Sequence, residues 1–380
     1  MDFNKTFKNE AMKEALNRAF NSGHWQGRGP YTKKVETLLG ERFDRQVWMM
    51  TSCTHALELA VRLCKLDRDD EVILPSYSYP SDANAVLLCG AKICYAPVEK
   101  DSYCLDLEAL PGLISDKTKA VIVIHYAGVS YKIKELAKFC QDRGLILIED
   151  AAQAFGSTVD GQALGSFGDY GTLSFHSTKN VGCGEGGALV VSDKHKDQFE
   201  DIECFLEKGT DRAAYTRGNR EFYQWTGLGS SFVVSDLLMA ILYEGLKTFD
   251  VDNELRCRAY QSYVDFFRQL KHPAILNYSG KKAVETKHNA HLFYLVFRTK
   301  EQAQVFIEGM KQRKIACYRH FYPLHASTYG KKFLLESESF TLEEHLGESL
   351  VRLPLYTRMT KQETSNVLSS VAEVMGRIHG

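Results

Sequence analysis

Short, nearly continuous apolar runs that alternate with segments of helical spacing constrain the fold of this chain more than any other feature. The runs cover residues 71–75, 91–95, 120–124 and 145–148. Such runs are typical of parallel strands that are buried on both faces. Between them, residues 54–66 and 133–141 carry apolar side chains at helical spacing, and Gly144 follows the second segment as a helix-ending glycine. We therefore predict an α/β fold in which helices cover a mainly parallel sheet.

The second half of the chain indicates a separate, smaller unit. A long amphipathic helix is predicted from Ser235 to about Leu255. The elements predicted beyond it are a strand at 292–297, a helix at 301–313 and a terminal helix at 361–378 with Thr360 as its N-cap. The 380 residues, 44% of them hydrophobic, are enough for one large and one small core. We predict a large domain over 1–235, and a linking helix with a smaller C-terminal α+β domain over 236–380.

The charge balance argues against nucleic acid and anionic membranes as partners, since the formal net charge is -1 and the pI is near 6.9. The first residues form no apolar signal core, and no apolar run reaches 18 residues. The 10 cysteines are scattered without a Cys-x-x-Cys pair, and the histidines form no helical His-x-x-x-His pair. We therefore expect reduced thiols, no metal site and a cytoplasmic protein that does not enter a membrane.

One lysine and one aspartate stand at positions that suit cofactor chemistry. The segment 174–188 places Lys179 between the strand-like run 170–175 and a glycine-dense turn, and Asp150 ends the fourth apolar run. Pyridoxal phosphate (PLP) requires a lysine that forms a Schiff base with its aldehyde and an acid that keeps its pyridine nitrogen protonated. The lysine must lose a proton to react, which burial or a neighbouring cation such as His176 favours.

Three further elements would complete a PLP site. Ser52 and Thr54 begin a predicted helix, where backbone N–H groups and hydroxyls suit a phosphate. Tyr79 follows a strand and would stack on a flat ring, and Gln153 would hydrogen-bond the ring's phenolic oxygen. Taken alone, each feature has a commoner interpretation: an ordinary N-cap, a packed tyrosine in a turn, or a surface lysine in a glycine loop. Their shared order, each after a strand, favours the cofactor site.

With these motifs in this order, the chain resembles the DegT/DnrJ/EryC1/StrS family of PLP-dependent nucleotide-sugar aminotransferases from residue 27 to residue 356. The matching segments include 52–54, 75–77, 83–85, 90–93, 125–128, 149–153, 174–176, 178–180, 184–187, 207–210, 229–231, 289–291 and 323–325. They are most similar to the branch that aminates C4, as dTDP-4-amino-4,6-dideoxygalactose transaminases do. The resemblance implies a fold-type I PLP-dependent aminotransferase that forms a homodimer with two active sites at the subunit interface.

The resemblance also implies roles for individual cofactor-binding residues. Lys179 would be the Schiff-base lysine, Asp150 the pyridinium partner, Gln153 the neighbour of the ring oxygen and Tyr79 the stacking aromatic. The implied phosphate contacts are Cys53, Thr54 and Ser174. Ser231 takes the place of a family asparagine that reaches the partner subunit's cofactor phosphate, and it is the shorter side chain.

Candidate substrate residues lie in two segments. His325 matches a histidine near the sugar in relatives, while His320 and Tyr322 either join it or only pack the C-terminal domain. The polar segment 208–221 is predicted as a long loop, which is often functional. Its cations are Lys208, Arg212 and Arg217. They would meet a nucleotide diphosphate or remain an ordinary solvated surface.

These features predict a transaminase with two half-reactions. L-glutamate would convert PLP to pyridoxamine phosphate, which would aminate C4 of a nucleotide-linked 4-keto-6-deoxyhexose while Lys179 moves the proton. The expected substrate is dTDP-4-keto-6-deoxy-D-glucose, and the expected pathway is lipopolysaccharide O-antigen biosynthesis. Two alternatives remain: a C3 transaminase for a 3-keto sugar, and a non-catalytic PLP-binding regulator. A PLP sugar dehydratase would have histidine in place of Lys179.

Overall fold

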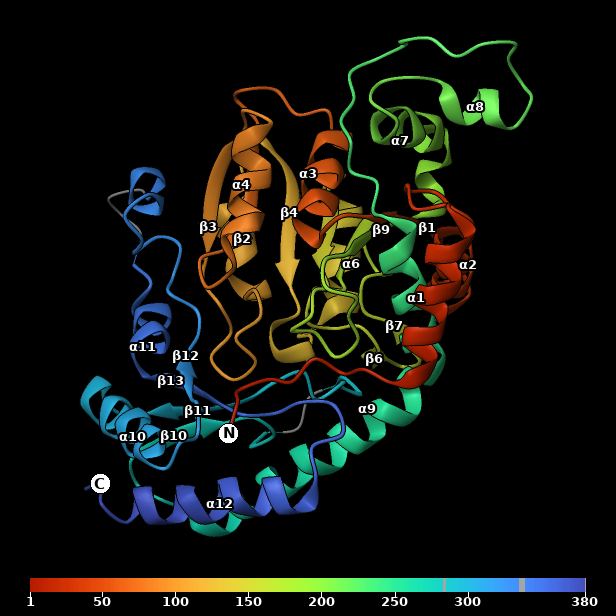
Figure 1. Cartoon of the computed structure of the whole chain (residues 1–380). Helices are drawn as coiled ribbons and strands as arrows, with labels where there is room; N and C mark the ends of the chain where they lie inside the picture. Colours follow the sequence, from red (N-terminus) through yellow and green to blue (C-terminus); the bar gives the residue numbers. More distant parts are fainter. Residues whose placement is uncertain (283–284, 335–338, 380) are drawn as a thin grey trace.

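The computed structural model describes residues 1–282, 285–334 and 339–379. A seven-stranded sheet forms the centre of the N-terminal part (Figure 1), in the order β1–β9–β8–β5–β4–β2–β3. Its strands are β1 (Gln46–Met50), β2 (Glu71–Pro75), β3 (Lys92–Ala96), β4 (Thr118–Ile124), β5 (Ile146–Asp150), β8 (Tyr170–Ser174) and β9 (Gly187–Val191). Strand β9 is antiparallel to both neighbours, and the pairs from β8 to β3 are parallel. The predicted mainly parallel sheet is confirmed.

Helices cover both faces of this sheet. The helices on one face are α2 (Pro30–Phe43), α6 (Ile133–Asp142) and the first half of α9 (Asp236–Leu270). Those on the other are α3 (Cys53–Leu63), α4 (Pro80–Leu88) and α7 (Phe199–Leu206). Because successive strand residues point to opposite faces, Met49 joins the first core and Met50 the second. Burial on both faces explains why these strands are continuous apolar runs in the sequence.

Several smaller elements also belong to the N-terminal part of the chain. They are α1 (Glu10–Ser22), α5 (Leu110–Leu113), α8 (Arg212–Thr216) and the hairpin of β6 (Thr158–Val159) and β7 (Gln162–Ala163). Helix α8 lies within the segment 208–221, so the prediction of a loop there was wrong for these residues. None of its residues is buried. It therefore leaves no apolar periodicity from which a helix could be predicted.

A second, antiparallel sheet carries the C-terminal part, in the order β10–β11–β13–β12. Its strands are β10 (Ile275–Tyr278), β11 (Phe293–Phe297), β12 (Tyr318–Arg319) and β13 (Leu350–Leu353). Its helices are α10 (Lys300–Gln312), α11 (Thr341–Ser349) and α12 (Lys361–Met375). The predicted strand and both predicted helices are confirmed. Thr360 is the N-cap of α12, and its hydroxyl accepts a hydrogen bond from the backbone N–H of Glu363.

Helix α9 connects the two sheets and runs along both of them (Figure 1). The helix begins where it was predicted, with Ser235 as its N-cap, but it continues to Leu270 rather than ending near Leu255. The additional turns carry an apolar face, including Tyr263 and Phe267, that packs on the second sheet. The apolar face of α9 therefore packs first on the large sheet and then on the second sheet, without a break in the helix. No helix among the described residues is long and apolar enough to cross a membrane.

Residues at the start of the chain contact the C-terminal part. The backbone N–H of Ala316 donates to the carbonyl of Met1 over 3.1 Å, and the ring of Phe3 lies edge-on to Tyr318 at 5.2 Å. The N-terminus accordingly lies beside the second sheet (Figure 1). The division between residues 235 and 236 stays a prediction, but these contacts place the first residues with the smaller unit.

Candidate active site

A cavity of about 580 Å³ lies at the carboxyl ends of the parallel strands. The predicted site residues that line it are Cys53, Thr54, Tyr79, Asp150, Gln153, Ser174, Lys179 and His320. All of them except His320 come together because the strands that precede them end at the same edge of the large sheet, whereas His320 follows β12 of the second sheet. Arg352 and Leu353 of β13 line the cavity from the second sheet. The site is therefore built from both parts of the chain.

Two neighbouring acids at the end of β5 have different environments. The Glu149 side chain is fully buried and accepts a hydrogen bond from His125 Nε2 over 2.8 Å. It also accepts three backbone N–H groups, from Gly165, Phe167 and Gly168. Asp150 instead lines the cavity. Of these two acids, Glu149 therefore stabilises the fold through buried hydrogen bonds, whereas Asp150 can contact a ligand in the cavity.

The Asp150 carboxylate is held by its own chain. Its Oδ1 accepts the backbone N–H of Ala152 over 2.8 Å. Burial raises the pKa of Asp150, while the Ala152 N–H and the charges of Lys179 and His125 act in the opposite direction. A protonated pyridine nitrogen in the cavity would give this buried carboxylate a charged hydrogen-bond donor.

Lys179 lies on a tight loop between β8 and β9. Its backbone N–H donates to the carbonyl of His176 over 2.9 Å, and that of Ser177 donates to Gly184 over 2.9 Å. Gly182 is required for this close folding, since a Cβ there would lie 2.5 Å from the His176 oxygen. Burial lowers the pKa of the Lys179 amine, and the nearby Asp150 carboxylate acts in the opposite direction. A lowered pKa favours the neutral amine that attacks an aldehyde.

Asn180 anchors the lysine loop to the other side of the cavity. Its Nδ2 donates to the carbonyl of Asn289 over 2.8 Å and to Asn253 Oδ1 over 3.0 Å. Its Oδ1 lies 2.9 Å from Nδ1 of His291, which also lines the cavity. The residue beside Lys179 is thus tied both to α9 and to the segment before β11.

The start of α3 offers a phosphate site. Ser52 caps the helix, accepting the backbone N–H of His55 over 3.1 Å, and the hydroxyl of Thr54 lies 2.7 Å from that of Ser81. Strand β9 passes so close that a Cβ on Gly187 would lie 2.2 Å from the Ser52 carbonyl carbon. The backbone N–H groups of a helix N-terminus, together with the hydroxyls that line the cavity beside them, suit a dianionic phosphate.

The remaining donors fit PLP as well. Gln153 Oε1 accepts the backbone N–H of Ala127 over 2.8 Å, which leaves its amide N–H groups for a ligand oxygen. The ring of Tyr79 lines the cavity and is 55% exposed, so an aromatic face remains free for stacking. Phosphate donors, an acid, an amide and a buried amine therefore line one cavity, as the cofactor requires.

Sequence reasoning did not single out Arg352. Its guanidinium lines the cavity, and among the described residues its Nε has no hydrogen-bond partner. It lies over the ring of Phe3 at 4.8 Å, and burial lowers its pKa. His320 lies nearby, with Nδ1 3.3 Å from the Tyr126 hydroxyl. Burial, followed by the charges of Arg352 and Lys179, lowers the pKa of His320 well below its usual range.

Several predicted residues do not line this cavity. His325 is buried, with its ring 4.6 Å from that of Phe340 and its Nε2 3.6 Å from Glu344. Tyr322 is 66% exposed, and Ser231 is also on the surface. Their roles, and those of Lys208 and Arg212, stay predictions.

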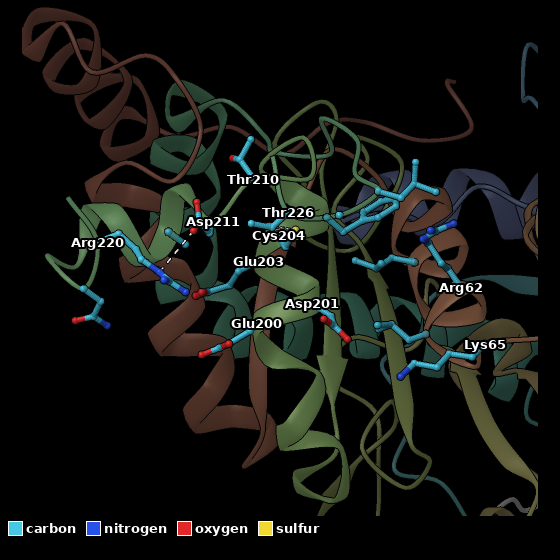
Figure 2. Close-up of a pocket in the computed structure, with 18 of the residues that line it drawn as sticks. Arg62, Lys65, Glu200, Asp201, Glu203, Cys204, Thr210, Asp211, Arg220 and Thr226 are labelled. Carbon is cyan, nitrogen blue, oxygen red and sulfur yellow. Dashed lines mark hydrogen bonds and ion pairs between the residues drawn. The ribbon is translucent and has the colours of Figure 1, made fainter. Parts of the chain in front are cut away.

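The polar segment after α7 borders a separate cavity of about 800 Å³ (Figure 2). Figure 2 shows Arg62 and Lys65 on one side of it and acidic residues of α7, such as Glu203, on the other. Arg217 Nη1 contacts Glu203 at 2.8 Å, and Arg212 Nη1 lies 3.8 Å from Glu207. In this chain, these cations face acidic side chains of their own surface rather than Lys179.

A buried lysine, a buried acid and a helix N-terminus line one cavity at the edge of a mainly parallel sheet, as expected for a fold-type I PLP-dependent aminotransferase. The chain belongs to the DegT/DnrJ/EryC1/StrS aminotransferase family, whose sequence profile matches residues 7–372. The predicted fold, cofactor and enzyme class, a PLP-dependent sugar aminotransferase, are confirmed. No group of metal-ligating side chains suited to an ion occurs among the residues that the structure covers.

Three relatives illustrate the similarity. An uncharacterised protein of Methanocaldococcus jannaschii is 30% identical over 376 residues, covering 96% of this chain and 95% of its own. The GDP-perosamine synthase of Escherichia coli O157:H7 is 25% identical over 363 residues, covering 95% and 94%. The crystal structure of the aminotransferase TlmJ from Streptoalloteichus hindustanus has a TM-score of 0.90 at 24% identity, covering 99% of both chains, and supports the fold.

Proposed function

We propose that this enzyme transfers the amino group of L-glutamate to C4 of a nucleotide-linked 4-keto-6-deoxyhexose, with dTDP-4-keto-6-deoxy-D-glucose as the first candidate. The observation that carries the transamination is the convergence of Lys179 and Asp150 on one cavity with phosphate donors at the start of α3. The choice of C4 and of dTDP rests on the resemblance of the sequence motifs. A sugar aminated at C4 in this way would serve lipopolysaccharide O-antigen synthesis in the cytoplasm.

The residues have separable tasks. When bound, PLP supplies an aldehyde that reacts with amines and a ring that accepts an electron pair. Asp150 would hold a proton on the pyridine nitrogen, and the hydroxyls and N–H groups at Ser52 and Thr54 would hold the phosphate. Lys179 would move a proton from the amino-bearing carbon of the donor to C4′ of the cofactor, and in the second half-reaction from C4′ to C4 of the sugar. Its lowered pKa suits a group that must both accept and release a proton.

Arg352 supplies a site for the amino donor. Its unpartnered Nε is a charged donor in a largely enclosed space, and a carboxylate is the ligand that a guanidinium binds best. L-glutamate carries two carboxylates, and a 4-keto-6-deoxyhexose ring carries none. We therefore assign Arg352 to the donor half-reaction.

The nucleotide has a second candidate. Two relatives, from Escherichia coli O157:H7 and Vibrio cholerae, are named GDP-perosamine synthase, and the second is 36% identical over 179 residues. Their names give GDP as the carrier of the sugar. A GDP-linked 4-keto-6-deoxyhexose is therefore the alternative substrate, while the cofactor chemistry at Lys179 stays the same.

The exposed position of Ser231 and the segment 208–221 supports a homodimer in which each site is completed by its partner. These residues lie outside the Lys179 cavity of their own chain. The resemblance implies that Ser231 takes the place of an asparagine that reaches the partner subunit's cofactor phosphate. We propose the same arrangement here, with one loop serving the opposite cavity.

Product identification tests the proposal. Purified protein, PLP and L-glutamate are given dTDP-, UDP- and GDP-linked 4-keto-6-deoxyhexoses and a dTDP-linked 3-keto sugar in separate reactions. NMR should find the new amine at C4 of the dTDP product. Amination of only the 3-keto sugar would overturn the position, and preference for the GDP substrate would select the second candidate. The Lys179→Ala protein is the blank, and the exposed-lysine variant Lys196→Ala is the matched active control.

A further inference from the structure

The first residues of the chain form part of the Lys179 cavity. Phe3 and Asn4 line it, together with residues of both sheets. Phe3 also contacts a cation of the cavity, because the guanidinium carbon of Arg352 lies over its ring, 4.8 Å from the centroid. Residues 1–5, called the N-terminal strap below, therefore border the side chain that we assign to the amino donor.

The N-terminal strap is fixed to the C-terminal part of the chain on both sides of Phe3. Before Phe3, the carbonyl of Met1 accepts the backbone N–H of Ala316 over 3.1 Å. After it, Lys5 Nζ lies 2.6 Å from Oε1 of Glu363, in the first turn of α12. These contacts hold the Phe3 ring in one place beside the second sheet.

The Phe3 ring holds Arg352 without neutralising it. The edge of this aromatic pair is completed by Tyr318 of β12, whose ring centroid lies 5.2 Å from that of Phe3. Besides the ring, Arg352 Nη2 donates to the carbonyl of Arg319 over 3.4 Å, and its buried Nε has no hydrogen-bond partner among the described residues. An aromatic ring attracts a guanidinium through its electron-rich face and brings no negative charge to it. The charge of Arg352 therefore remains available for a carboxylate in the cavity.

We propose that Phe3 is a positioning residue for the amino donor, whose ring keeps the Arg352 guanidinium oriented to bind a carboxylate of L-glutamate. This inference rests on the proposed assignment of Arg352 to the donor half-reaction. Phe3 acts through Arg352, so it contributes to the affinity for the donor and leaves the proton transfer at Lys179 unchanged.

Two substitutions separate the aromatic contact from simple packing. Phe3→Leu keeps an apolar side chain but removes the ring, so KM for L-glutamate should rise by about three- to tenfold, as expected for the loss of a cation–π contact. Phe3→Tyr keeps the ring, and its KM should stay within about twofold of the wild-type value. In both variants, kcat and KM for the nucleotide sugar should change by less than about twofold. An unchanged KM for L-glutamate in Phe3→Leu, or an equal loss for both substrates, would overturn the proposal.

A nearby phenylalanine provides a matched control. Phe7 makes the same type of contact, with the guanidinium carbon of Arg358 over its ring at 4.5 Å, but it does not line the cavity. Phe7→Leu should therefore leave KM for L-glutamate within about twofold of the wild-type value. In an Arg352→Ala background, Phe3→Leu should cause no further rise in KM, because its effect passes through Arg352. A further rise there, or an equal effect of Phe7→Leu, would contradict the proposed role of Phe3.

A binding measurement tests the same contact without turnover. Glutarate has the two carboxylates of L-glutamate but no amino group, so it binds without reacting. Isothermal titration calorimetry of the holoenzyme should show that Phe3→Leu raises the Kd for glutarate by about three- to tenfold, whereas Phe7→Leu leaves it unchanged. Equal Kd values in wild type and Phe3→Leu would refute the inference even if the enzyme aminates a sugar. The expected rise in Kd, in an enzyme that aminates none of the nucleotide sugars, would support the inference and refute only the proposed substrate.

Discussion

The Lys179 cavity and the surface segment after α7 hold their charged groups differently. Asp150, which lines the cavity, and the adjacent Glu149 are buried and fixed by backbone N–H groups. After α7, the cations pair with acids through partly exposed side chains, as Arg217 does with Glu203. Trp225, in the same segment, is 81% exposed. The first region is preorganised within one chain, whereas the second has an apolar and charged surface still open to a partner.

This difference has energetic consequences. A buried carboxylate that loses a partner keeps its desolvation cost, so changes in the cavity should be large. Exposed ion pairs are screened by water, and their loss should be small.

Replacing Lys179 by alanine should abolish transamination, with a loss of at least about 1,000-fold in kcat, because both the nucleophile and the proton carrier are removed. Borohydride treatment of the wild-type holoenzyme should fix the cofactor covalently to the peptide that contains Lys179, as shown by mass spectrometry. Lys196→Ala, which changes an exposed lysine, should remain active. Labelling of a different lysine would show that the reactive amine is misassigned.

Asp150→Asn should lower kcat by roughly 100-fold, because a neutral amide no longer favours the protonated ring on which charge develops. The fold should remain intact by circular dichroism. The neighbouring change Glu149→Gln provides the contrast, since it should reduce stability by about 2 kcal/mol or more through the buried acceptor of several N–H groups. Near-normal turnover in Asp150→Asn would mean that the ring nitrogen lies elsewhere.

Arg352→Ala should raise KM for L-glutamate by about 10- to 100-fold, the range expected for hydrogen bonds between charged groups. KM for the nucleotide sugar should change little, and Arg352→Lys should recover part of the affinity. Steady-state kinetics with each substrate varied in turn measures both values. An equal loss for both substrates would indicate a structural role for Arg352.

Mixing inactive chains tests whether the exposed segment completes the partner's site. A Lys179→Ala chain is exchanged with a chain in which Lys208, Arg212 and Ser231 are all alanine. If the sites are shared, a heterodimer has one site with an intact lysine and an intact loop. Equal mixing should then give about one quarter of the wild-type activity, since half of the dimers are mixed and each has one competent site of two.

The exchange must be verified with differently tagged chains, and the loop variant must be inactive alone. Mixed dimers that stay inactive would mean that lysine and loop serve the same chain, or that the loop has no part in the site.

The smallest effect is expected for Arg217→Ala. Its ion pair with Glu203 is partly exposed, so the free energy of unfolding should change by less than about 1 kcal/mol. Thermal or chemical denaturation of the isolated protein measures it, with Arg268→Ala, another exposed helix cation, as the control. A loss comparable to that of Glu149→Gln would remove the contrast between the two regions.

The sequence was sufficient to predict the strand-end positions. Asp150 and Lys179 could be assigned because buried strands are short apolar runs, and parallel strands bring their carboxyl ends together. The extent of α9 was underestimated because its later turns pack on a second sheet, which local periodicity does not reveal. Helix α8 escaped prediction because it buries no side chain.

Arg352 could not be selected from the sequence for a different reason. It is indistinguishable there from any cation on a strand. Its importance arises only when the fold brings it from a distant position in the chain to the cavity. Burial that results from tertiary packing leaves no pattern in the local sequence.

The hydrogen bonds of Asn180 couple the position of Lys179 to both parts of the chain. The residue after Lys179 is bonded to Asn253 of α9 and to the carbonyl of Asn289. Any sliding of the smaller unit against the larger one must therefore displace the amine or break these bonds. If Lys179 forms the Schiff base, as proposed, the absorbance of the bound cofactor should change when the two parts of the chain move, and stopped-flow absorbance would measure this in the unlabelled protein.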